Sequence, residues 1–112
     1  HLNDIRVLDT ETFIWSRLRV SGTPPEHRYG HTMDVSGSDI LLFGGWTRTS
    51  GARFKHEPTE ECCDYFMIWS TDTMSWKKGK YIGNPPTSRF GHTSTAIGPH
   101  LLIFGGWEYT KA

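Results

Sequence analysis

The chain has 112 residues, a normal length for one domain, and 12 basic residues balance 12 acidic ones to a net charge of zero. Because no run of either sign occurs, we expect neither nucleic acid nor a membrane as a partner. Residues 40–43, the longest strictly apolar run, are too short to cross a bilayer, and residues 1–10 do not resemble a secretion signal, so we expect a cytoplasmic protein.

Short strand signals follow one another along the chain, and none of the segments has a helical period. The first 27 residues contain two of these signals, within NDIRVLDTETFIWSRL at 3–18. The next four are GHTMDV at 30–35, DILLFGGW at 39–46, DYFMIWS at 64–70 and SWKKGKY at 75–81. The last two strand signals lie within residues 89–107 and resemble those at 30–35 and 39–46. The pattern predicts an all-β chain.

The chain repeats itself with a shift of 61 positions, which aligns residues 3–46 with 64–107 without a gap. RYGHT at 28–32 returns as RFGHT at 89–93, and FGGW at 43–46 returns in the same way. Four antiparallel strands in each unit, with two glycines ending the second strand, are typical of a β-propeller blade.

These residues resemble a kelch motif. RxGH enters the first strand, GG ends the second, an aromatic residue lies near the third, and a tryptophan lies in the fourth. The resemblance implies kelch-type propeller blades of four antiparallel strands, with one full blade and two half-blades. We divide the chain into an outer half-blade (1–27), a complete blade (28–81, with an inserted loop at 47–63) and an inner half-blade (82–112).

The repeated residues favour structural roles. The glycine pairs at 44–45 and 105–106 permit positive φ where the second strand ends. Trp15 and Trp76 offer large surfaces that a neighbouring blade can bury. The repeated pairs His31 with His92 and Arg28 with Arg89 are expected to make hydrogen bonds or ion pairs between blades, because one asymmetric active site would not need them twice.

The repeat spacing of 61 exceeds the usual kelch length by about ten residues, and the excess lies in residues 47–63. In an up-and-down sheet this loop shares one face with the connections at 18–28 and 79–89, and loops gathered at one end of a scaffold commonly bind ligands. The residues we expect to contact a partner are Arg48, Arg53, Lys55, His56, Glu60 and Glu61. The alternative is a solvated loop whose charges contact only water.

Two functions stay open. The resemblance implies a non-catalytic module that binds a protein partner, with no catalytic residue, metal or cofactor. The alternative is part of a kelch-type enzyme, either a copper oxidase using Cys63 and Tyr65 or a lyase or epimerase acting on sugars or small metabolites. Cys62 and Cys63 are adjacent, which does not match common zinc spacings, and we expect both to be free thiols.

The half-blades have complementary missing strands. The chain starts with His rather than Met, so we expect it to be trimmed, processed or excised from a longer protein. If it is stable alone, the inner strands of one copy can accept the outer strands of another, and three copies make a six-bladed ring. We therefore expect either a homo-trimer or a piece of a longer propeller.

Overall fold

In the computed structural model, residues 2–46 and 66–108 are described, and they form ten strands without a helix. The strands are β1 (Arg6–Leu8), β2 (Trp15–Arg17), β3 (Thr32–Ser36), β4 (Asp39–Phe43), β5 (Phe66–Ser70), β6 (Ser75–Lys78), β7 (Arg89–Phe90), β8 (Thr93–Ile97), β9 (His100–Phe104) and β10 (Trp107–Glu108). This confirms the all-β prediction. Within these ranges, no helix could span a membrane.

The complete blade is the antiparallel sheet β3–β4–β5–β6. Its buried hydrophobic cluster comprises Leu42, Met67, Trp69 and Trp76, and the last two rings meet edge to face with centroids 5.5 Å apart. Leu42 and its neighbour Phe43 are both buried, although successive side chains of a strand point to opposite faces. The continuous apolar run at 40–43 is therefore explained by neighbours on both faces of the sheet.

The two hairpins on either side of this sheet reproduce its halves. β1 pairs with β2 in the register that β5 makes with β6, and Leu8 opposite Trp15 corresponds to Trp69 opposite Trp76. Phe13 and Met74 occupy the same turn position and both have positive φ, 58° and 53°. The pairing of β8 with β9 likewise repeats that of β3 with β4. The sequence repeat is therefore a repeat of backbone geometry.

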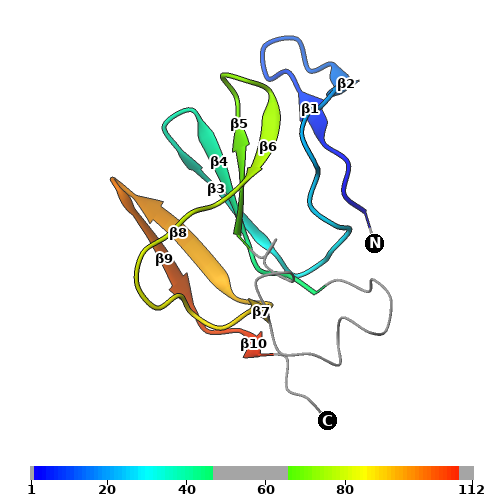
Figure 1. The fold of residues 1–112 in the computed structure, drawn as a ribbon. Helices are drawn as coiled ribbons and strands as arrows, with labels where there is room; N and C mark the ends of the chain where they lie inside the picture. The colour runs from blue at the N-terminus through cyan, green and yellow to red at the C-terminus, as the bar shows by residue number, and fades with distance from the viewer. Residues whose placement is uncertain (1, 47–65, 109–112) are drawn as a thin grey trace.

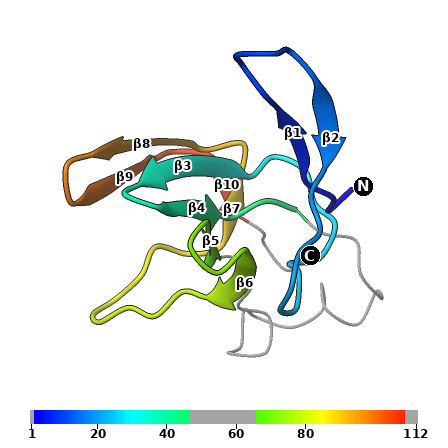
Figure 2. The same ribbon diagram turned by 90° about the horizontal axis from the view of Figure 1, so that it is seen from above.

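The β1–β2 and β8–β9 hairpins lie on opposite sides of the complete blade (Figure 1). Seen from above, β8 runs alongside β3 (Figure 2). Ile5 and Leu18, which flank the first hairpin, pack against the hydrophobic cluster of the complete blade. Trp76 is buried as predicted, whereas Trp15 is 67% exposed in the single chain. Among the described residues, no inner strands lie beside β1–β2 to cover it.

Candidate functional site

The six residues predicted to contact a partner lie outside the described residues. They are Arg48, Arg53, Lys55, His56, Glu60 and Glu61. Trp46 directly precedes their segment in the chain, so the site is best built from the end of the blades at which Trp46 lies. The limits set for the three units, 1–27, 28–81 and 82–112, stay a prediction.

Each repeat closes this end with a short antiparallel contact. In the complete blade, the Tyr29 amide donates to the Trp46 carbonyl at 3.1 Å, and the Trp46 amide donates to the Tyr29 carbonyl at 2.7 Å. In the next repeat, β7 and β10 pair Phe90 with Trp107. Both contacts lie at the opposite end of the blades from the β3–β4 and β5–β6 turns (Figure 1). In each repeat, the RxG motif and the GGW motif therefore lie side by side.

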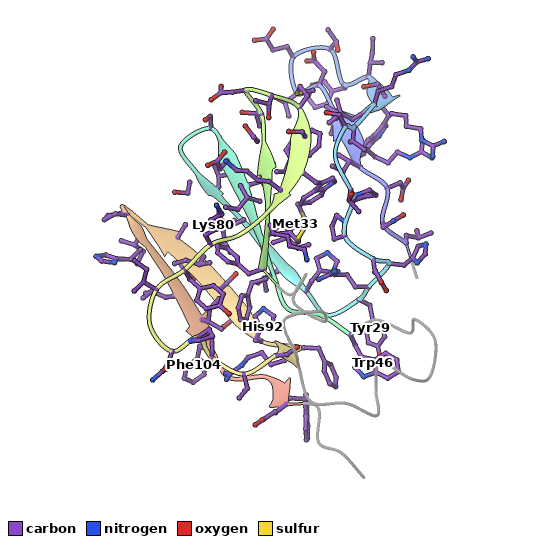
Figure 3. The ribbon with its side chains drawn as sticks, viewed as in Figure 1. Tyr29, Met33, Trp46, Lys80, His92 and Phe104 are labelled. Carbon is purple, nitrogen blue, oxygen red and sulfur yellow. The ribbon has the colours of Figure 1, made fainter. Side chains whose placement is uncertain are left out.

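The paired residues of both contacts are aromatic, and we call Tyr29, Trp46, Phe90 and Trp107 the aromatic cluster. The Tyr29 ring centroid lies 5.8 Å from that of Trp46 and 6.3 Å from that of Phe90. Figure 3 shows Tyr29 and Trp46 side by side at this end. Trp107 is 72% exposed and Tyr29 is 47% exposed. The cluster thus joins two repeats while leaving aromatic surface open to solvent.

The two repeated arginines donate hydrogen bonds to backbone carbonyls at this end of the blades. Arg28 is buried, and its Nη1 donates to the Gly44 carbonyl at 3.0 Å. Arg89 Nη1 donates to the Gly105 carbonyl at 3.1 Å, which is the same bond one repeat later. We expected bonds between blades, but these two bonds each lie within one blade. The glycine pair ends the second strand with positive φ and leaves a carbonyl within the arginine's reach.

His92 does join two blades, as predicted. Its Nε2 and the Thr32 hydroxyl share a hydrogen bond of 2.8 Å, and its ring meets the Phe43 ring edge to face at 5.2 Å. Burial lowers the pKa of His92 and nearby Arg89 adds to the effect, while the Phe43 carbonyl opposes it. His31 is exposed as a residue, but neighbouring atoms keep some water from its imidazole. This partial desolvation lowers the pKa of His31, and nearby Arg28 adds to the effect. The described residues give His31 no contact equivalent to that of His92.

The chemistry of this end suits recognition. Aromatic faces accept apolar and cationic side chains, and Tyr and Trp are enriched among residues that dominate binding energy at protein interfaces. Within residues 2–46 and 66–108, no group of three or more His, Cys, Asp or Glu could hold a metal ion. Sequence reasoning missed the cluster, although an aromatic residue follows both arginines and both glycine pairs. That repeated pattern could have revealed it.

The four-stranded sheet, the two hairpins that repeat its halves, the glycine pairs and the arginine bonds define a protein built from β-propeller blades. The model of the KLHDC2/KLHL20/DRC7 Kelch-repeats domain matches residues 1–112. The chain belongs to the kelch-repeat family.

Several proteins of known type are similar to it. A probable serine/threonine-protein kinase of Dictyostelium discoideum is 39% identical over 105 residues, which cover 91% of this chain and 7% of that protein. The human Rab9 effector protein with kelch motifs is 33% identical, with 93% and 26% covered. Human host cell factor 2 is 32% identical, with 99% and 15% covered. The chain therefore spans about a quarter or less of these relatives.

Proposed function

We propose that the chain is a non-catalytic module that binds a protein partner at the end of the blades where the aromatic cluster lies. The observation that carries the proposal is the contact of the Tyr29 ring with the rings of Trp46 and Phe90, together with the exposed Trp107 that pairs with Phe90 in β7–β10. A rigid aromatic surface loses little conformational freedom on binding, so more of its contact energy is kept. The name of the Rab9 effector relative, a protein that acts with another protein, supports the same class of function.

The charged segment that follows Trp46 in the chain would supply specificity. Its basic half contains Arg48, Arg53 and Lys55, and its acidic half contains Glu60 and Glu61. Charges around an apolar centre mainly steer the approach of a partner and reject wrong ones. We therefore propose an aromatic centre with a charged rim, which fits a partner that presents an apolar or arginine side chain within a segment of mixed charge.

The test begins with a partner found by cross-linking and mass spectrometry on the 112-residue chain. Trp107→Ala should weaken its binding at least about tenfold, the loss typical of an aromatic anchor. Ile97→Ala is the matched control, because Ile97 is also exposed but lies beside the β8–β9 turn at the opposite end. Arg48, Arg53 and Lys55 changed together to Ala should slow association. Unchanged affinity in both variants would contradict the proposal.

We also propose that three copies of the chain complete their half-blades in one six-bladed ring. The support is that each copy carries one full blade and the two complementary hairpins. A head-to-tail contact closes into a ring when its rotation allows. Light scattering should give a uniform mass of three chains, whereas a well-behaved monomer would overturn this assembly without affecting the binding proposal.

A further inference from the structure

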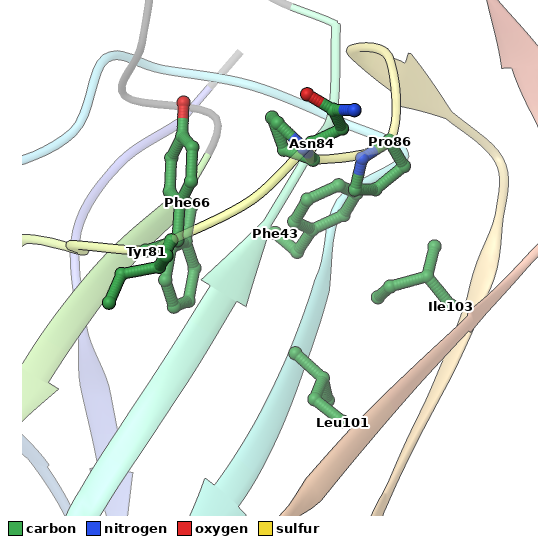
Figure 4. Close-up of a pocket in the computed structure, with 9 residues that line it drawn as sticks. Phe43, Phe66, Tyr81, Asn84, Pro86, Leu101 and Ile103 are labelled. Carbon is green, nitrogen blue, oxygen red and sulfur yellow. The ribbon is translucent and has the colours of Figure 1, made fainter.

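An apolar pocket lies between the complete blade and the β8–β9 hairpin (Figure 4). Leu101 and Ile103 of β9 form one wall, and Phe43, Phe66 and Tyr81 face them. The remaining lining residues are Ile82, Asn84, Pro85 and Pro86. Ile82 and Tyr81 are exposed, so the pocket is open to solvent along its rim. A pocket of this composition favours an apolar occupant.

The complete blade shows what fills the corresponding place. Ile40 and Leu42 precede Leu101 and Ile103 by 61 positions, and they belong to the cluster that contains Trp69 and Trp76. These tryptophans come from the β5–β6 hairpin, whose strand β5 pairs with the outer edge of β4. In the described part of the chain, no strand pairs with the outer edge of β9. The β8–β9 hairpin therefore lacks a partner of the β5–β6 type.

The chain contains one further hairpin of that type, β1–β2, with Leu8 and Trp15 in place of the two tryptophans. It cannot reach β9 of its own chain. The amide of Ser21 donates to the Met74 carbonyl, and the amide of Trp76 donates to the Ser21 carbonyl. These bonds hold the hairpin on the far side of the complete blade (Figure 1). A second copy of the 112-residue chain can offer it to β9.

We propose that β1–β2 of a second copy pairs antiparallel with β9 and inserts its Trp15 into the pocket. This rests on the proposed self-association and gives it a residue-level geometry. The register follows from β4 and β5, which pair Ile40 with Trp69 and Phe43 with Phe66. Shifted by the repeat, the pairs are His100 with Asp9, Leu101 with Leu8, Leu102 with Val7, Ile103 with Arg6 and Phe104 with Ile5.

Several of the facing side chains on the two edges suit each other. Trp15 of the second copy and Phe104 of the first, 67% and 81% exposed in the free chain, both gain apolar neighbours. The pairing sets the His100 imidazole opposite the Asp9 carboxylate, a donor opposite an acceptor. The hydrogen bond between His92 and Thr32 predicts an equivalent between His31 of the second copy and Thr93 of the first. His31 would then gain the contact that it lacks in a single chain.

Cysteine pairs test the register directly, in chains whose Cys62 and Cys63 are changed to Ser. Oxidation of the Val7→Cys, Leu102→Cys chain should link most of the protein between copies, because these positions lie opposite each other. Leu8→Cys with Leu102→Cys is the matched control, since a shift of one residue points the two side chains to opposite faces. That control should stay near the background level on a non-reducing gel.

Trp15→Ala gives the second readout. It should raise the dissociation constant of the assembly at least about 30-fold, the effect of losing a central aromatic anchor. Phe13→Asn removes a similarly exposed ring from the turn of the same hairpin and should leave the assembly intact. This geometry would be overturned, but not the ring, if the protein has the mass of three chains and the Val7–Leu102 link does not form. The same holds if the three-chain assembly is unaffected by Trp15→Ala. A monomeric wild-type chain would overturn both.

Discussion

The Nε2 atom of His92 lies 2.8 Å from the hydroxyl oxygen of Thr32, 60 positions earlier in the chain. The bond connects the first strand of the complete blade to the segment that enters the first strand of the next. The same junction contains the Gly45 amide, which donates to the Arg89 carbonyl at 2.8 Å, and the Gly91 amide, which donates to the Gly30 carbonyl at 2.9 Å. Ser94 also donates to the Asp34 carboxylate there. Polar bonds at the inner strands thus accompany the apolar contacts between blades.

Stability should fall in mild acid because of His92. Burial, with help from Arg89, lowers the pKa of His92 below its ordinary value of 6.5, so the unfolded chain binds a proton at higher pH than the folded one. The contribution is fully present above pH 6.5 and is lost as the pH falls below it. Urea unfolding between pH 8 and pH 5 should show a shallower decline for His92→Gln than for the wild type. Parallel pH profiles would contradict this.

Gly44→Ala should destabilise the chain more than Gly105→Ala. Both glycines have a φ of 69°, so each substitution brings the same backbone strain, about 1–2 kcal/mol. A Cβ atom at Gly44 would lie 2.5 Å from the Arg89 carbonyl oxygen and 2.5 Å from His92 Cε1, whereas one at Gly105 meets nothing within 4 Å. Thermal unfolding of a monomeric sample would measure the difference. Equal losses of stability for the two variants would show that the junction can adjust. A larger loss for Gly105→Ala that occurs only in an assembled sample would indicate that a second copy lies beside Gly105.

Trp76→Ala should cost about 3–5 kcal/mol of unfolding free energy, because it removes a buried ring that contacts Trp69. Trp107→Ala, on an exposed ring, should change that free energy by less than about 0.5 kcal/mol. Urea titration followed by circular dichroism measures both. A small loss in the Trp76 variant would mean that the hydrophobic cluster is not what holds the complete blade.

Cys62 and Cys63 should be reduced, accessible and dispensable. Adjacent cysteines close a disulfide only through a strained ring, so two free thiols are expected in a native titration. Changing both to Ser should leave the melting temperature within about 2 °C of the wild type. Fewer than two reactive thiols together with a large loss of stability would show that they are buried or bind a metal.

The sequence determined the strands because each depends on local features: short apolar runs, turn residues and glycines at positions that need positive φ. The shift of 61 also predicted which strands correspond, and the identical registers of β1–β2 and β5–β6 confirm it. The binding prediction on residues 47–63 stays open, because Arg48, Arg53 and Lys55 lie outside the described residues.

Only the tertiary structure decided what the repeated residues contact. Trp15 and Trp76 occupy the same place in the repeat, yet one is exposed and the other is buried, because burial depends on neighbours in space and only Trp76 has an inner strand pair beside it. Arg28 and His92 belong to the same repeated motif, but the arginine bonds within its blade and the histidine bonds across to the preceding one. The long arginine side chain reaches back along its own sheet to a glycine carbonyl, whereas the shorter imidazole contacts Thr32 and Phe43 of the sheet that packs against it.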